Sequence, residues 1–222
     1  VATFFIFNSF QTIAAFSFFI IVYYLFQGDA NAAGVWPTLH GSVGALLTTF
    51  LVIPIVTKMS ERLGKKKTFV ISQAISILGY ILFWFLFIPG KPYMFLFALP
   101  LFSFGIGGLF TLMMSMTADT CDLDELNNGL PRKEATFGAL YWWMVKFGTA
   151  LAGLFSGIIM STVGFDASLP EQTESAMTGL RIFYTVLPVI GTCIAIYVMK
   201  NYEINEASAK EVSNILAKRN NK

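Results

Sequence analysis

The chain has 222 residues, of which 55% are hydrophobic and only 13% are charged, and its mean hydropathy is +0.66. Apolar runs longer than about 18 residues recur along its whole length, which excludes a soluble globular domain and indicates a protein that crosses a membrane several times. The formal net charge of +2 comes from residues between these runs. It therefore does not indicate nucleic-acid binding, and we expect no nucleic-acid partner.

Six membrane spans follow from the apolar runs. Each is long enough, at about 1.5 Å per residue, to cross a hydrocarbon core of about 30 Å. In chain order we place them at about Thr3–Phe26, Thr38–Thr57, Lys67–Ile88, Tyr93–Thr117, Ala135–Val163 and Met177–Met199. Because the chain starts at Val1 and enters the first run at once, we interpret its start as a truncation and not as a signal peptide.

Basic residues between the spans predict the orientation. Lysine and arginine gather between spans two and three, between spans four and five, and after span six, whereas the opposite side is mostly acidic. The basic positions are Lys58, Arg62, Lys65, Lys66, Lys67, Arg132, Lys133, Lys200, Lys210, Lys218, Arg219 and Lys222. Since positively charged loops stay in the cytoplasm, we predict a cytoplasmic C-terminus and a multi-pass protein of the plasma (inner) membrane.

We divide the chain into a six-helix bundle, residues 1–200, and a cytoplasmic tail, residues 201–222. Between Glu203 and Arg219, apolar residues recur at near-helical spacing: Ile204, Ala207, Val212, Ile215 and Leu216. This pattern is typical of a short amphipathic helix on the cytoplasmic face. A solvated tail with weak helicity is the alternative, and the sequence leaves both open.

The turn after span two reads Ser60-Glu61-Arg62-Leu63-Gly64-Lys65-Lys66-Lys67. It resembles the cytoplasmic loop of the major facilitator superfamily, in which an acid and an arginine latch neighbouring helices when the inward gate is shut. A basic loop that faces anionic lipid and sets the topology is the alternative interpretation.

A second stretch carries a more specific resemblance. Asp119, Asp122 and Glu125 precede Asn128-Gly129, Arg132-x-Glu134-Ala135 and a span containing Lys146-Phe147-Gly148. This arrangement resembles the signature of the glycoside-pentoside-hexuronide:cation symporters, the family of the melibiose permease. Tyr23-Tyr24 and Tyr202-x-Ile204 also resemble this family. Leu123 and Asn128 depart from its usual residues, but the charged positions do not.

The resemblance implies an all-α integral membrane protein. The six transmembrane helices would form the C-terminal bundle, with 3+3 inverted repeats, of a twelve-helix major facilitator superfamily transporter. It also implies cation-coupled symport of a sugar or glycoside by alternating access, in partnership with the N-terminal six-helix half. A lipid or other organic-solute carrier of the same fold is the alternative. We do not expect an enzyme, because the sequence contains no HExxH, GxSxG or Cys/His cluster.

Lys146 is the strongest site candidate, because a lysine at the centre of an apolar helix costs about 3 kcal/mol on insertion scales. No acidic residue of this sequence lies at its depth. Its partner is then water, substrate or the other half, and a structural lysine is the alternative. In the resembled family the matching lysine faces aspartates of the N-terminal half, which form the cation site. The coupling Na+ or H+ would thus be bound mainly there, and we expect no other cofactor and no metal site in this chain.

We predict substrate contacts around Lys146 in spans one and five. Trp142 lies one turn away on the same face, and an aromatic ring beside polar donors suits a sugar. The predicted substrate-binding residues are Lys146, Trp142, Gln11, Tyr141, Thr149 and Asn8. A membrane-interface or core role for Trp142 is the alternative. For His40, at the outer end of span two, we expect a solvated end residue in preference to a proton relay.

Two further expectations concern the helix ends and the packing. Mixed charges near the cytoplasmic face suggest a gate made of Asp119, Asp122, Glu125, Arg132, Glu134 and Arg62, with Arg132 paired to an acid of its own loop or of the opposite half. A solvated loop is the alternative. Glycines in spans four and five predict seams where helices approach closely: Gly105, Gly107, Gly108, Gly148, Gly153 and Gly157.

Overall fold

The computed structural model describes residues 1–128 and 132–220, and the part it describes is helical, with no strand. Six of its helical stretches are long and apolar enough to cross a membrane, as the sequence predicts. They are Ala2–Leu25, Ala30–Leu63, Lys65–Leu86, Pro92–Asn128, Glu134–Thr162 and Glu174–Asn201. Gly129, which belongs to the motif after the fourth span, lies outside the described residues.

Several spans combine more than one helical element. The α-helices are α1 (Ala2–Phe19), α2 (Ala30–Ala33), α3 (Trp36–Leu47), α4 (Ile53–Leu63), α5 (Lys65–Leu86), α6 (Leu99–Gly108), α7 (Met114–Asn128), α8 (Glu134–Thr162), α9 (Glu174–Val198) and α10 (Glu206–Asn220). Wider π-helical segments continue three of them: η1 (Ile20–Leu25) after α1, η2 (Thr48–Val52) between α3 and α4, and η4 (Leu109–Met113) between α6 and α7. Tight 3₁₀ turns, η3 (Pro92–Phe97) and η5 (Met199–Asn201), precede α6 and follow α9.

Local chemistry explains several of the helix ends. The Asp29 carboxylate accepts hydrogen bonds from the N–H groups of Asn31 and Ala32, both at 2.9 Å, and so caps α2. The hydroxyl of Thr173 accepts from Ala176 N–H at 3.2 Å and caps α9. Gly64, with a φ of 81°, is the single residue between α4 and α5, because a positive φ is open to glycine at little cost.

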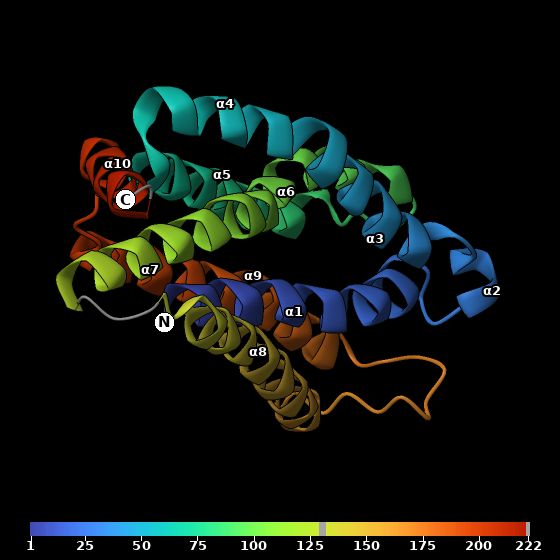
Figure 1. Cartoon of the computed structure of the whole chain (residues 1–222). Coiled ribbons are helices and arrows are strands. Elements are labelled where there is room, and N and C mark those ends of the chain that lie inside the picture. Colours follow the sequence, from blue (N-terminus) through green and yellow to red (C-terminus); the bar gives the residue numbers. More distant parts are fainter. Residues whose placement is uncertain (129–131, 221–222) are drawn as a thin grey trace.

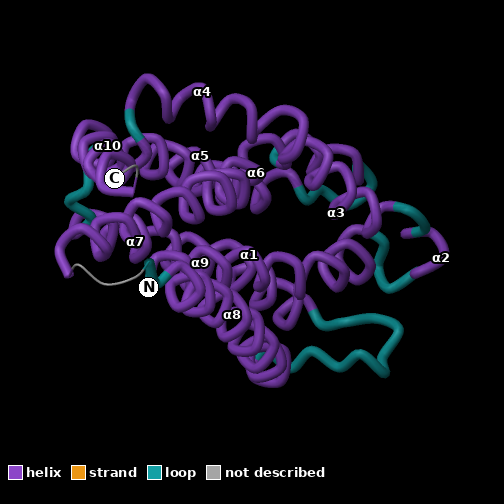
Figure 2. The backbone as a smooth tube through the Cα atoms, viewed as in Figure 1, coloured by secondary structure: helices purple, strands orange, loops and turns teal. Residues whose placement is uncertain are grey.

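The spans run between the same two ends of the bundle, with α8 inclined to the others, and the connections gather at these ends (Figure 1). One end holds both termini of the described chain, the α4–α5 turn, the end of α7 and α10. The other end holds α2 and the long connection between α8 and α9, as the backbone trace also shows (Figure 2). The predicted basic loops and the tail therefore share one end of the bundle.

The packing of the spans repeats after three helices. α1 packs against α8 and α9, and α6 packs in the same way against the α3–α4 stretch and α5. The pair of α5 and α9 completes the pattern. Span one thus corresponds to span four, span two to span five, and span three to span six, and the contacts within one triplet and between the triplets keep the same pattern under this exchange. Because successive spans alternate in direction, the two triplets are inverted, which agrees with the predicted 3+3 repeats.

Small residues allow the closest helix approaches, as the sequence predicts for span four. A Cβ on Gly105 would lie 2.9 Å from Ser76 Oγ, and a Cβ on Gly108 would lie 2.9 Å from Ser72 Cβ. In span five the prediction is wrong for Gly153 and Gly157, which are exposed and would place an added Cβ more than 4 Å from any neighbour among the described residues. Gly148 alone forms a seam there, because only its face of α8 meets α1.

The structure also extends the helices beyond the predicted fourth and sixth spans. The acidic residues Asp119, Asp122 and Glu125 lie on the last turns of α7 and not in a loop, because the helix continues beyond the apolar run to Asn128. The tail forms the helix α10, and its buried residues Val212 and Leu216 belong to the helix that packs on α7. Of the two interpretations of the tail, the amphipathic helix is therefore the one observed.

Candidate functional site: a polar helix face, a groove and a charged end

Lys146 lies on α8, about 18 Å along the helix axis from Glu134 at about 1.5 Å per residue. Its neighbours Val145 and Gly148 are buried against α1, and Lys146 itself points away from the bundle and is exposed. No hydrogen bond or ion pair reaches its ammonium from residues 1–128 or 132–220. A charge at this depth without a partner requires a polar environment outside the surface of this bundle.

Asn8 joins α1 to α8 directly. Its side-chain amide donates a hydrogen bond to the Gly148 carbonyl at 3.1 Å, two residues from Lys146. Beside this contact the rings of Phe4 and Phe147 stack with centroids 5.6 Å apart, and Trp143 stacks on Phe147 at 5.0 Å. The stacked tryptophan is therefore Trp143, whereas the sequence favours Trp142.

The other predicted contacts are spread over different surroundings. Tyr141 is buried and meets Trp142 edge to face at 5.5 Å, and both line a small cavity of about 120 Å³ between α7 and α8. The hydroxyl of Thr149 donates to the Val145 carbonyl at 3.1 Å, within its own helix. Gln11 is half-buried on α1. The six predicted residues thus do not converge on one point in this half.

A larger groove of about 820 Å³ lies between α1, α3 and α6. Its lining is apolar apart from the hydroxyls of Ser17, Thr38, Thr48 and Thr49 and the ring of His40. Phe10 of α1 and Phe102 of α6 stack in this lining, with centroids 5.8 Å apart and rings 14° from parallel. An aromatic surface with few polar groups is typical of a small-molecule site.

None of the groove residues is among the predicted contacts. They come from three helices that are distant in the sequence, so no local motif marks them. The one residue of the groove that the sequence singles out is the lone histidine, His40. The expectation that it is a solvated end residue is wrong. His40 is 5% exposed and is enclosed by Phe83, Phe95 and Phe102, with ring centroids between 5.5 and 6.2 Å from its own. Burial follows because α3 turns this side chain toward the aromatic core.

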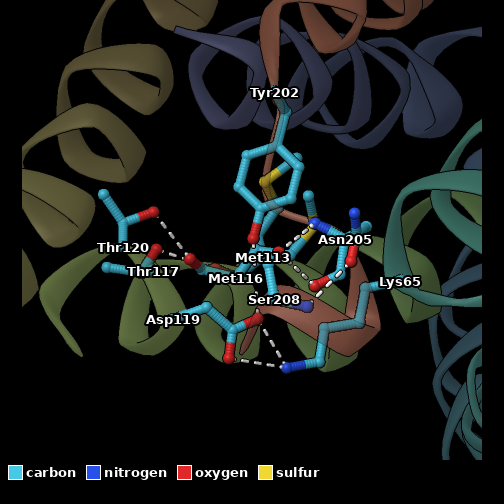
Figure 3. A network of polar contacts seen from close by, with 9 residues as sticks. All are labelled: Lys65, Met113, Met116, Thr117, Asp119, Thr120, Tyr202, Asn205 and Ser208. Atoms are coloured by element: carbon cyan, nitrogen blue, oxygen red, sulfur yellow. Dashed lines mark hydrogen bonds and ion pairs between the residues drawn. The ribbon is translucent and has the colours of Figure 1, made fainter. Parts of the chain in front are cut away.

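At the opposite end of the bundle, Lys65 and Asp119 form an ion pair with N–O distances of 2.6 and 2.8 Å (Figure 3). The hydroxyl of Tyr202 lies 3.5 Å from the same carboxylate. Burial raises the pKa of Tyr202 above its usual range, and the negative charge of Asp119 raises it further. Lys66 donates to the carbonyls of Lys200 at 2.9 Å and Tyr202 at 2.6 Å. The α4–α5 turn, α7 and the start of the tail are thus connected.

A second set of ion pairs joins α7 to the start of α8 and to the tail. Arg132 pairs with Asp122, and its Nε donates to Glu134 at 3.0 Å, a hydrogen bond that raises the pKa of Arg132. Lys133 pairs with Asp124 at 3.3 Å. Arg219 of α10 pairs with Glu125, which is 8% exposed.

Five of the six predicted gate residues therefore take part in this network: Asp119, Asp122, Glu125, Arg132 and Glu134. Arg62 is exposed and forms no ion pair with the described residues. Lys65, three positions after Arg62, forms the ion pair with an acid of another helix that the motif had suggested for Arg62. The sequence did not predict the partners Arg219 and Tyr202, because they come from the tail. Within the described ranges, no group of three or more His, Cys, Asp or Glu side chains has the arrangement of a metal site.

Comparisons with known proteins cover almost the whole chain. Residues 1–206 match the family model described as MFS/sugar transport protein. The chain is 28% identical over 200 residues to a glucuronide carrier protein homolog of Escherichia coli (strain K12), which covers 90% of this chain and 42% of that protein. It is 24% identical over 210 residues to the uncharacterized symporter YnaJ of Bacillus subtilis (strain 168), covering 88% and 44%.

A third relative is the isoprimeverose transporter of Lactiplantibacillus pentosus, which is 24% identical over 180 residues, covering 78% of this chain and 36% of that transporter. The chain thus spans less than half the length of these three relatives.

Proposed function

Because the chain belongs to the MFS/sugar transport protein family, we propose that it is one half of a twelve-helix secondary transporter. The other half supplies six further helices, and the two bundles move against each other to expose a central site alternately to each side of the membrane. The substrate is a sugar or glycoside, and a cation moves with it. The repeated three-helix packing and the names of the relatives support this proposal.

The position of Lys146 is the observation that supports the proposal most strongly. Its ammonium is halfway along an apolar helix, exposed, and without a partner among the described residues of this bundle. Lipid would make this position costly, whereas a water-filled path between two bundles would not. Carboxylates of the second half provide its counter-charge and bind most of the coupling Na+ or H+. Lys146 then couples cation binding at that site to the binding of the sugar.

The ion pairs between α7, the start of α8 and the tail form the gate on the cytoplasmic side of the plasma membrane. Lysine and arginine gather at that end, together with the tail, which supports a cytoplasmic location. Pairs such as Arg132 with Asp122 hold α7 and the start of α8 together. Opening of the inward path separates pairs of this kind, and closing restores them.

Uptake by membrane vesicles that contain the full-length protein tests the proposal. The first probes are a radiolabelled glucuronide and isoprimeverose, the sugars in the names of two relatives. We expect uptake that increases when a Na+ or H+ gradient is imposed and that stops when the gradient is collapsed. Absence of uptake for a wider panel of labelled mono- and disaccharides, under both gradients, would contradict sugar transport and favour a lipid or other organic-solute carrier.

A further inference from the structure

The single histidine of the chain lies where the groove meets the aromatic core. His40 lines the groove between α1, α3 and α6, yet its ring is almost fully buried. One ring nitrogen, Nε2, lies 3.3 Å from the hydroxyl of Tyr184 on α9. No second hydrogen bond reaches the ring from residues 1–128 or 132–220. The other nitrogen, Nδ1, has no partner among these residues and is not fully enclosed, and the groove is the open space that His40 lines.

Tyr184 determines which nitrogen carries the proton. This residue is 1% exposed, and His40 is the only hydrogen-bond partner of its hydroxyl in the described part of the chain. A buried tyrosine hydroxyl needs an acceptor, and the surrounding rings of Phe83 and Phe87 offer none. The hydroxyl therefore donates to Nε2, and the neutral imidazole carries its own proton on Nδ1.

This proton is one of a few donors that the groove offers. The hydroxyls of Ser17 and Thr48 already donate to carbonyls of their own helices, at 3.1 and 2.8 Å. The hydroxyls of Thr38 and Thr49 also line the groove, on its exposed side. The groove lining includes no charged side chain among the described residues. An Nδ1–H that faces this surface without an acceptor is costly, so the site favours an oxygen-bearing ligand or water. Phe102, 6.2 Å from the His40 ring, and Phe10 stacked on it provide the apolar surface beside this donor.

We propose that His40 is a substrate-positioning residue, whose Nδ1–H donates a hydrogen bond to an oxygen of the sugar while the sugar lies against Phe10 and Phe102. Tyr184 holds the ring in the required tautomer from behind. This inference rests on the proposed function, and it places part of the sugar site on the outer part of the second span, away from Lys146. A sugar fits because it offers both C–H faces for the rings and oxygens for the donor.

Two substitutions at His40 separate the two nitrogens. The amide nitrogen of asparagine can occupy the position of Nδ1, whereas that of glutamine can occupy the position of Nε2. The dissociation constants of 4-nitrophenyl β-D-glucuronide and isoprimeverose are measured on the full-length protein in lipid nanodiscs. We expect His40→Gln to raise Kd about tenfold, the usual effect of one lost hydrogen bond, and His40→Asn to stay within about threefold of wild type.

Tyr184→Phe is the second variant, because it keeps the shape of the core and removes only the hydroxyl. It should raise Kd by about three- to tenfold, since the Nδ1–H tautomer is no longer favoured. Monodeoxy analogues of the better probe provide a readout that a packing role would not change. In wild type one missing hydroxyl should weaken binding, and in His40→Gln the same deletion should have no further effect.

Equal losses in His40→Asn and His40→Gln, or an unchanged deoxy pattern, would assign His40 to packing and overturn the inference. Unchanged affinity in His40→Gln and Tyr184→Phe, with normal uptake by wild type, would also overturn it and leave the proposed function intact. If wild type bound neither probe and took up no sugar of the wider panel, the proposed function and this inference would fail together.

Discussion

Lys65 and Asp119, which are 54 positions apart, join the start of α5 to the middle of α7 through an ion pair at 2.6 Å. Both side chains are mostly shielded, with 21% and 14% of their surface exposed. A pair in this setting is less weakened by solvent and salt than one on an open surface. It is thus the best-defined element of the charged end.

Reversal of this pair should restore what each single change removes. We expect Lys65→Glu and Asp119→Lys each to slow transport severalfold, because each leaves two like charges in contact. The double variant should recover at least half of the wild-type rate. Lys67→Glu is the control, since Lys67 is exposed. Initial uptake rates at equal membrane expression are the measurement, and a double variant no better than the singles would contradict a direct pairing role.

Arg132 should affect the rate of transport more than the binding of sugar. Arg132→Gln removes the positive charge between Asp122 and Glu134. We expect uptake to slow by about tenfold while Kd for the sugar changes less than about twofold, because in the proposed gate this pair acts on closure and does not line the groove. An uptake rate equal to that of wild type would remove Arg132 from the gate.

The tail should become more accessible to protease when an apolar side chain on the buried face of α10 is shortened. Leu216 is 6% exposed in α10, whereas the adjacent Ile215 is 43% exposed. We expect Leu216→Ala to raise the rate of trypsin cleavage in the tail about tenfold, which corresponds to about 1.4 kcal/mol of local stability. Ile215→Ala should leave that rate within about twofold. Similar rates for the two variants would contradict the packing of α10 on α7.

A methyl group at Gly79 should destabilise the bundle. A Cβ there would approach the Cα of Phe102 to 2.8 Å, and backbone cannot move aside as a flexible side chain can. We expect Gly79→Ala to reduce stability by about 1–3 kcal/mol. Gly138→Ala is the control, because no atom lies within 4 Å of its added methyl among the described residues. Thermal unfolding of the purified protein would contradict this packing if both variants had the same Tm.

The sequence predicts most of the membrane architecture, because the apolar runs alone limit how the chain can cross a bilayer. It also singles out Lys146 and Asn8, since a polar group in an apolar run needs no structure to be noticed. It does not locate the ends of the helices well: α7 carries Asp119 to Glu125 beyond the apolar run, where hydropathy gives no signal.

The groove and the contacts of the tail are beyond reach of the sequence for a different reason. Phe10, His40 and Phe102 meet only after α1, α3 and α6 have packed together. Glu125 and Arg219 are 94 positions apart, and nothing in either local sequence specifies the other. Such contacts depend on how whole helices are placed relative to one another. The spacing of apolar residues in the sequence does not specify that placement.

Uptake by Lys146→Ala tests the proposed coupling role of Lys146 most directly. Wild type, Lys146→Ala and Lys146→Arg are compared in vesicles at equal membrane expression, with Lys67→Ala as the control for loss of a lysine elsewhere. A coupling role for Lys146 predicts that gradient-driven accumulation of sugar disappears in Lys146→Ala, is partly retained in Lys146→Arg and is unchanged in Lys67→Ala. Accumulation by Lys146→Ala equal to that of wild type would contradict it and make Lys146 a structural residue.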